Sequence, residues 1–106
     1  MNDAIGALNA RARLESPLRS EDDLGGAAIA WRDEGEVWAA VEAHGVRQGA
    51  DYDAAPSVGG YTLHIRRRDG VRAGWRALWG ARAFKVLGVR DDGGARIALI
   101  CEEEIR

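Results

Sequence analysis

The chain has 106 residues and very few of the side chains that usually carry covalent or metal chemistry. Cys101 is its only cysteine, which excludes an internal disulfide. His44 and His64 are its only histidines, and no Cys-x-x-Cys or His-x-x-x-His spacing offers a set of metal ligands. Cys101 lies in an alternating apolar segment, so we expect a small, buried and unreactive side chain.

Long apolar runs are also missing. No stretch approaches the ~20 apolar residues that a membrane-spanning helix needs. Met1–Gly6 lacks the cationic start and the apolar core of a secretory signal. We therefore expect a chain that is made and folded in the cytoplasm and does not associate with a membrane.

Groups placed for catalysis are equally scarce. Asp51 with Asp53, and Asp91 with Asp92, sit in glycine-rich stretches where carboxylates normally stay solvated. None of the Gly-Gly pairs opens a helix after a strand, as a phosphate-binding loop would. The sequence thus predicts no catalytic residue, no metal, no cofactor and no enzymatic activity.

The charge balance gives no sign of free nucleic-acid binding. The formal net charge is −2 and the isoelectric point about 5.7, so no global basic field surrounds the chain. Lys85 is the only lysine among 15 basic residues. Coding bias toward arginine is one explanation. The other is that the planar guanidinium suits charged interfaces.

What the sequence does contain is period-two alternation between glycine-rich turns, which predicts an all-β domain spanning residues 1–106. We expect a small antiparallel β-barrel of six or seven strands, because closure leaves no sheet edge exposed. Pro17 should end the first strand, and Asp33-Glu34-Gly35 should turn the chain between the second and third. The expected strands are Ala10–Ser16, Ala27–Arg32, Glu36–Glu42, Tyr61–Arg67, Arg76–Trp79, Ala83–Arg90 and Ala95–Glu103.

A long irregular loop is expected between the third and fourth of these strands. No periodicity survives from His44 to Gly60, and such stretches inside compact domains are generally functional or disordered. The residues that mark this loop are His44, Gly45, Asp51, Asp53, Pro56, Gly59 and Gly60.

Two charged runs and four tryptophans are candidates for contacts with partners. The run Arg66-Arg67-Arg68 suits phosphates or an acidic partner, or is simply a solvated strand end. The run Glu102-Glu103-Glu104 has the opposite charge, so one subunit's acidic run could meet the next subunit's basic run. Trp31 and Trp38 are expected in the core, with a contact to a neighbouring subunit as the alternative for Trp38. Trp75 and Trp79 fit either the core or an interface.

The order of short motifs resembles the head-closure (head–tail joining, or stopper) proteins of long-tailed phages and of gene transfer agents. The likeness covers roughly Leu8 to Glu102. Its motifs are Leu8-Asn9-Ala10-Arg11, Arg13-Leu14-Glu15-Ser16-Pro17, Leu24-Gly25-Gly26, Trp31, Val37-Trp38-Ala39, Leu63-x-Ile65-Arg66, Ala81-Arg82-x-Phe84-x-Val86 and Leu99-Ile100-Cys101-Glu102.

The resemblance implies a structural protein of the virion neck that forms a ring of six or twelve copies. Such a ring contacts adaptor and portal proteins on the head side and a tail terminator or tail tube on the other. Packaged DNA passes through its channel without sequence-specific binding, and the loop from His44 to Gly60 would project toward that channel. The alternatives are a generic small-barrel binding module in the cytoplasm, or another ring component such as a tail terminator.

Overall fold

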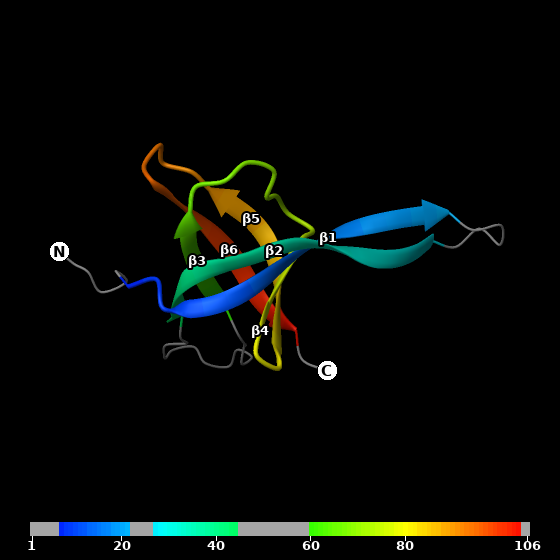
Figure 1. Ribbon diagram of the computed structural model, residues 1–106, viewed down its shortest axis with the longest axis horizontal. Helices are drawn as coiled ribbons and strands as arrows, with labels where there is room; N and C mark the ends of the chain where they lie inside the picture. The colour runs from blue at the N-terminus through cyan, green and yellow to red at the C-terminus, as the bar shows by residue number, and fades with distance from the viewer. Residues whose placement is uncertain (1–6, 22–26, 45–59, 105–106) are drawn as a thin grey trace, which may run out of the picture.

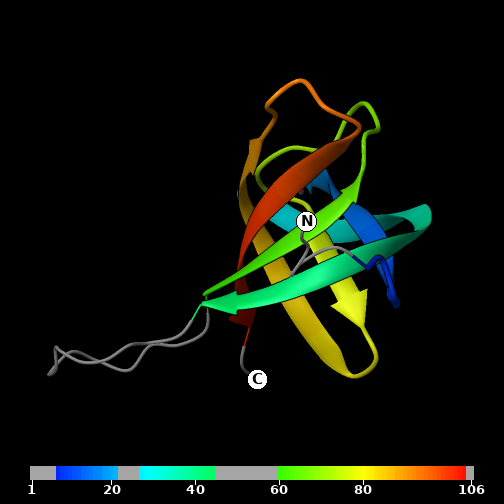
Figure 2. The same ribbon diagram turned by 90° about the vertical axis from the view of Figure 1, so that its left-hand side faces the viewer.

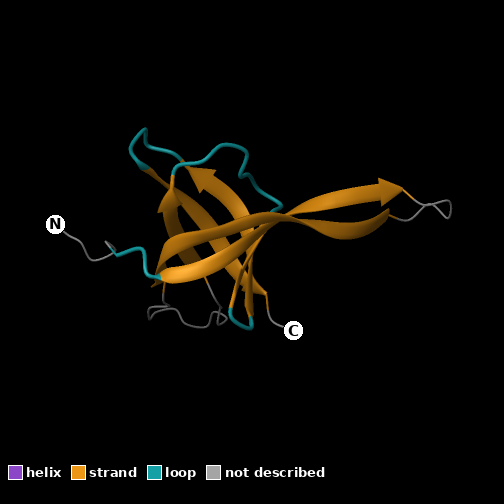
Figure 3. Cartoon of the chain, in the orientation of Figure 1, coloured by secondary structure: helices purple, strands orange, loops and turns teal. Residues whose placement is uncertain are grey.

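The computed structural model describes residues 7–21, 27–44 and 60–104, which form six antiparallel strands and, within those ranges, no helix (Figures 1 and 3). The strands close into a barrel in the order β1-β2-β3-β6-β5-β4. This confirms the predicted fold class. Their bounds are β1 Ala10–Glu21, β2 Ala27–His44, β3 Gly60–Arg66, β4 Arg76–Trp79, β5 Arg82–Arg90 and β6 Arg96–Glu104.

The barrel interior is built from the alternating apolar positions of every strand. Phe84, Leu14 and Leu63 are completely buried, and Cys101 is 2% exposed. Burial raises the pKa of the Cys101 thiol to about 12, as expected for an unreactive core side chain. The core cluster consists of Leu14, Ala39, Leu63, Ile65, Trp75, Ala77, Phe84, Val86, Ile97, Leu99 and Cys101.

Two hairpins close the second half of the barrel. Trp79 pairs with Arg82, and Gly80 takes a φ of +64° at the first position of the two-residue turn between them, where only glycine is at ease. Between β5 and β6, Asp91 accepts a hydrogen bond from the Gly93 amide, and Gly93 has a φ of +91°. The predicted hairpin at Asp91-Asp92-Gly93-Gly94 is therefore confirmed.

The expected end of the first strand at Pro17 is wrong. β1 continues through Pro17, which pairs with Trp31 of β2, and ends at Glu21. β4 pairs with β1 only from Arg13 to Glu15, so beyond that point β1 has a neighbour on one side alone. A proline is compatible with such an edge, because the open side of the strand needs no donor.

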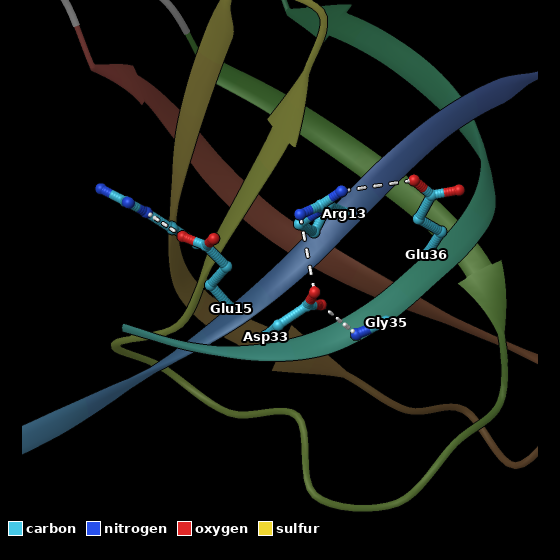
Figure 4. Close-up of polar contacts among 6 residues, drawn as sticks. Arg13, Glu15, Asp33, Gly35 and Glu36 are labelled. Carbon is cyan, nitrogen blue, oxygen red and sulfur yellow. Dashed lines mark hydrogen bonds and ion pairs between the residues drawn. The ribbon is translucent and has the colours of Figure 1, made fainter. Parts of the chain in front are cut away.

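The expected turn at Asp33-Glu34-Gly35 is also wrong, because β2 runs through it as one strand. Arg13 pairs with Glu36 and Glu15 pairs with Asp33, so Leu14 alone faces both Glu34 and Gly35. This arrangement is a β-bulge, and Gly35 takes a φ of +99° within it. The glycine that predicted a turn instead bends a continuous strand, and the polar contacts of this junction are drawn in Figure 4.

Beyond the bulge, β1 and β2 leave the barrel together as a two-stranded ribbon (Figure 1), and Figure 2 views the barrel from the side opposite this ribbon. We call this ribbon, residues 16–21 and 27–32, the arm. Its strands pair with one another and, among the described residues, with no third strand. The two strands predicted at Ala27–Arg32 and Glu36–Glu42 are thus the arm and barrel halves of β2.

Two tryptophans expected in the core lie outside it. Trp38 is 48% exposed, because Val37 and Ala39 take the inward positions of β2 and alternation turns Trp38 outward. Trp31 lies on the arm, where no barrel interior exists, and is half-buried. An apolar face on each side of β2 left both orientations open, and the larger side chain is the one that faces out.

Candidate functional site

A row of cationic and aromatic side chains crosses the outside of the barrel at one end. Arg11 of β1 stands opposite Trp38 of β2, with its guanidinium 4.8 Å from the indole centroid. Arg66 of β3 lines the same shallow hollow as Trp38, together with Leu8 and Asn9. Arg66 in turn stands opposite Arg96 at the start of β6. We call Arg11, Trp38, Arg66 and Arg96 the Arg–Trp row.

The charges of this row are compensated to different degrees. Arg66 and Arg96 are cross-strand neighbours. Arg11 is ion-paired with Glu36 at 3.0 Å, whereas Arg66 has no ion-pair partner among the described residues. An exposed tryptophan beside excess positive charge is the composition of a protein interface. Sequence reasoning favoured the core for Trp38 over a subunit interface, because its strand is apolar on both faces.

The basic run Arg66-Arg67-Arg68 is not a single surface. Arg67 donates to the Gly94 carbonyl and, in a bidentate pair, to the Asp91 carboxylate, so it fixes the β5–β6 turn. Arg68 donates to the Glu34 carbonyl at 3.2 Å and thereby satisfies the backbone of the bulge. Among the described residues, Arg66 alone of the three has no ion-pair partner.

The acidic run at the end of β6 divides in the same way. Glu103 forms an ion pair with Arg82 at 2.9 Å, and the hydrogen bonds from Arg82 lower the pKa of its carboxyl. Glu102 and Glu104, on either side of it, are exposed and point outward. We call Glu102 and Glu104 the acidic strand end. It lies at the opposite end of the strand that begins with Arg96.

Trp75 and Trp79 are both used inside the subunit. Trp75 is 8% exposed within the core, which leaves almost no surface for a neighbouring molecule. Trp79 stacks near Phe84 with ring centroids 6.3 Å apart, and the Arg82 guanidinium lies 5.2 Å from its indole centroid. Of the four tryptophans, Trp38 is therefore the one with a large exposed area.

Arg76 fixes the direction of the arm where it leaves the barrel. From β4 it donates to Glu15 of β1 at 2.8 Å, and its guanidinium stacks 4.1 Å from the indole centroid of Trp31. Ser16 reinforces the junction by donating to the Glu34 carboxylate at 2.6 Å. Both groups act on the first residues of the arm, so its orientation is defined by the barrel.

The expected channel loop has described residues only at its two ends. His44 and Gly60 are cross-strand partners that end β2 and begin β3, so they stand where the predicted loop leaves and rejoins the barrel wall. The segment therefore joins β2 to β3. Gly45, Asp51, Asp53, Pro56 and Gly59 lie outside the described residues, and their place in a channel stays a prediction.

The two histidines form side-chain pairs between β2 and β3. The His44 ring nitrogen lies 2.7 Å from the Thr62 hydroxyl, and that of His64 lies 3.0 Å from Glu42. The His64 hydrogen bond lowers the pKa of the Glu42 carboxyl. Within residues 7–21, 27–44 and 60–104, no cluster of three or more His, Cys, Asp or Glu residues could hold a metal ion. Nor does that part of the chain contain a helix with the length and hydropathy to cross a membrane.

Comparisons with known proteins agree with the resemblance seen in the motifs. Residues 4–104 match the family model described as phage head completion protein. A chain from the virion of a native gene transfer agent particle superposes with a TM-score of 0.74 and 30% identity, covering 93% of this chain and 96% of that one.

A second structural neighbour extends the likeness in fold. It is a protein of Shigella flexneri 2a solved in solution, with a TM-score of 0.73 and 22% identity, covering 98% of this chain and 99% of that one. Curated proteins gave no sequence match.

Proposed function

The chain belongs to the phage head completion protein family and is a structural protein of the virion neck, and we propose that it acts there as a stopper. In this role it forms a homo-oligomeric ring of six or twelve copies beneath the portal–adaptor complex. The ring seals the filled head and presents the surface on which the tail docks. The match of residues 4–104 to the family, with a 30% identical chain in a gene transfer agent particle, carries this proposal.

The architecture of the subunit suits a structural role in the virion. All six strands are paired at both edges within the barrel, and the core is continuous from β1 to β6, so the subunit has a rigid body of its own. Outside that body stand the arm, the Arg–Trp row and the acidic strand end. Each presents exposed side chains that are not part of the barrel core. Together they provide contacts to neighbouring copies, to the adaptor and to the tail.

The proposal is tested by removing the protein from otherwise complete particles. We expect negative-stain micrographs of particles lacking this chain to show heads and tails that remain separate, and heads that lose their DNA. Adding the purified protein to such heads should restore the joining of tails. Tailed, DNA-filled particles in its absence would contradict the stopper function.

A further inference from the structure

The arrangement of charge along β6 identifies how copies of this chain contact each other. Arg96 begins the strand within the Arg–Trp row, and Glu104 ends it in the acidic strand end. At ~3.3 Å per residue, these two groups are about 25 Å apart on one barrel wall. Ala98 and Ile100 are the outward positions between Arg96 and Glu102, so no charged residue of β6 stands between the two surfaces.

We propose that the Arg–Trp row of one copy binds the acidic strand end of the next copy, with Trp38 as the central anchor. Glu102 and Glu104 would pair with the positive charge of Arg66, while the exposed indole and Leu8 lose their contact with water. This inference rests on the proposed ring and names the contact that closes it.

Three observations favour a second copy of this chain as the partner that binds the Arg–Trp row. The two surfaces have opposite charge and occur on the same subunit, so each copy carries both halves of the contact. They lie at opposite ends of one strand, so the contact joins different surfaces and propagates from copy to copy. Trp38, at 48% exposure beside an open hollow, supplies the apolar area that charges alone lack.

Charge complementarity of this kind sets register more than affinity. The row spans β1, β2, β3 and β6, whereas the acidic strand end occupies two residues of one strand. The neighbouring β6 therefore meets the row end-on, near the hollow lined by Leu8, Asn9, Trp38 and Arg66. Closure into a ring follows if each successive contact repeats the same rotation.

Cysteine cross-linking tests the contact without removing any of its charges. Asn9→Cys places a thiol at the hollow, and Lys85→Cys places one opposite Glu102. The native Cys101 stays silent because it is buried and its pKa is raised to about 12. We expect assembled chains carrying both substitutions to form a ladder with a short bis-maleimide, ending at the copy number of the ring.

The controls use chains with one substitution each. A mixture of Asn9→Cys and Lys85→Cys chains should give dimers only, because each cross-link then consumes both thiols. If the doubly substituted chain also stops at dimers, the contact is two-fold symmetric and the proposal is overturned. Absence of cross-links between copies in assembled particles would overturn it as well.

A matched pair of substitutions tests the anchor itself. Trp38→Ala should reduce tail joining by about tenfold or more, as expected for a central interface tryptophan, with an unchanged melting temperature. Leu87→Ala removes an equally exposed apolar side chain, also 48% exposed, from β5 and should join tails normally. Normal joining by Trp38→Ala would refute the anchor role.

The outcome is separable from that of the proposed function. If particles without the protein are complete, the stopper function fails. If those particles lack tails while Trp38→Ala joins them normally and no ladder forms, the stopper function stands and the contact proposed here fails.

Discussion

The barrel and the arm are made from the same two strands, yet they are stabilised in different ways. Inside the barrel, β1 and β2 have a neighbour on each side and turn Leu14 and Ala39 into the core. In the arm, the same strands have only each other, and Leu18 is 42% exposed. A two-stranded ribbon is marginally stable in water at best. The arm therefore depends on its junction with the barrel.

The junction shows how one strand serves both regions. The bulge at Glu34 and Gly35 changes the direction of β2, and Arg13 holds its two sides through Asp33 and Glu36 (Figure 4). The Gly35 amide donates to Asp33 at 2.8 Å. Bulges of this kind increase the local twist and bend a strand. A few residues at the bulge therefore determine where the barrel ends and the arm begins. Substitutions at these residues should affect the two regions differently.

The largest expected effect lies in the barrel. Phe84→Ala should lower the free energy of unfolding by ~3–5 kcal/mol, the usual cost of deleting a buried phenylalanine. Phe84 is fully buried, with the Tyr61 ring edge-on at 5.0 Å between centroids. Leu18→Ala in the arm is the control and should cost less than ~0.5 kcal/mol in the free subunit. Denaturant unfolding measures both, and equal losses would show that the arm shares the stability of the barrel.

A smaller effect is expected at the bulge. Gly35→Ala should destabilise by about 1–2 kcal/mol, because an alanine resists the positive φ of this position. A Cβ at Gly35 meets nothing within 4 Å, so the cost is one of backbone conformation alone. Gly94→Ala is the matched control, since its Cβ also meets nothing and its φ is not positive. Similar melting temperatures for the two variants would mean that the bulge tolerates other geometries.

The third effect concerns the arm and is mostly local. Arg76→Met removes the stacking on Trp31 and the ion pair with Glu15, together worth about 1 kcal/mol. We expect the amides of Ser16 and Leu18 to exchange hydrogen faster while those of β3 and β6 remain protected. Arg72→Met, at an exposed position, should leave the arm unchanged. Faster exchange throughout the barrel would indicate that Arg76 supports the core instead.

Sequence reasoning worked best where the alternation of apolar and polar residues allows only one inward face. Tyr61, Leu63 and Ile65 alternate with polar residues, so their inward face was unambiguous and the structure confirms Leu63 and Ile65 as fully buried. The hairpin at Asp91–Gly94 was equally clear, because its residues favour only a tight turn. Barrel closure followed from the number of strands and the cost of open edges.

The failures lie where one residue type serves two structures. Gly35 supplies a positive φ to a turn or to a bulge, and local sequence does not distinguish them. Pro17 ends a central strand but is compatible with an edge, and only the limited length of the β1–β4 pairing makes it an edge. Trp38 is apolar on a strand with two apolar faces, so its exposure depends on which face the barrel closes around. Arg67 and Arg68 are adjacent to Arg66 but have internal partners that lie 24 and 34 residues away.

The smallest expected effect concerns an exposed ion pair of the barrel and not its core. The hydrogen bonds from Arg67, and after them the Gly93 amide, lower the pKa of Asp91 from 3.8 to about 2. A carboxyl whose pKa is lowered by folding stabilises the fold above the unfolded pKa, and that contribution is lost as the pH falls through the folded pKa. We therefore expect wild-type stability to decline between about pH 4 and pH 2 by a part that Asp91→Asn abolishes. Both residues are exposed, so the difference at neutral pH should be small.

Titration of the Asp91 carboxyl by NMR checks the cause directly, because Arg67→Met should return its pKa toward the ordinary value. A carboxyl that titrates near 3.8 in the wild type would show that the pair does not persist in solution, and that the β5–β6 turn is held by its backbone alone.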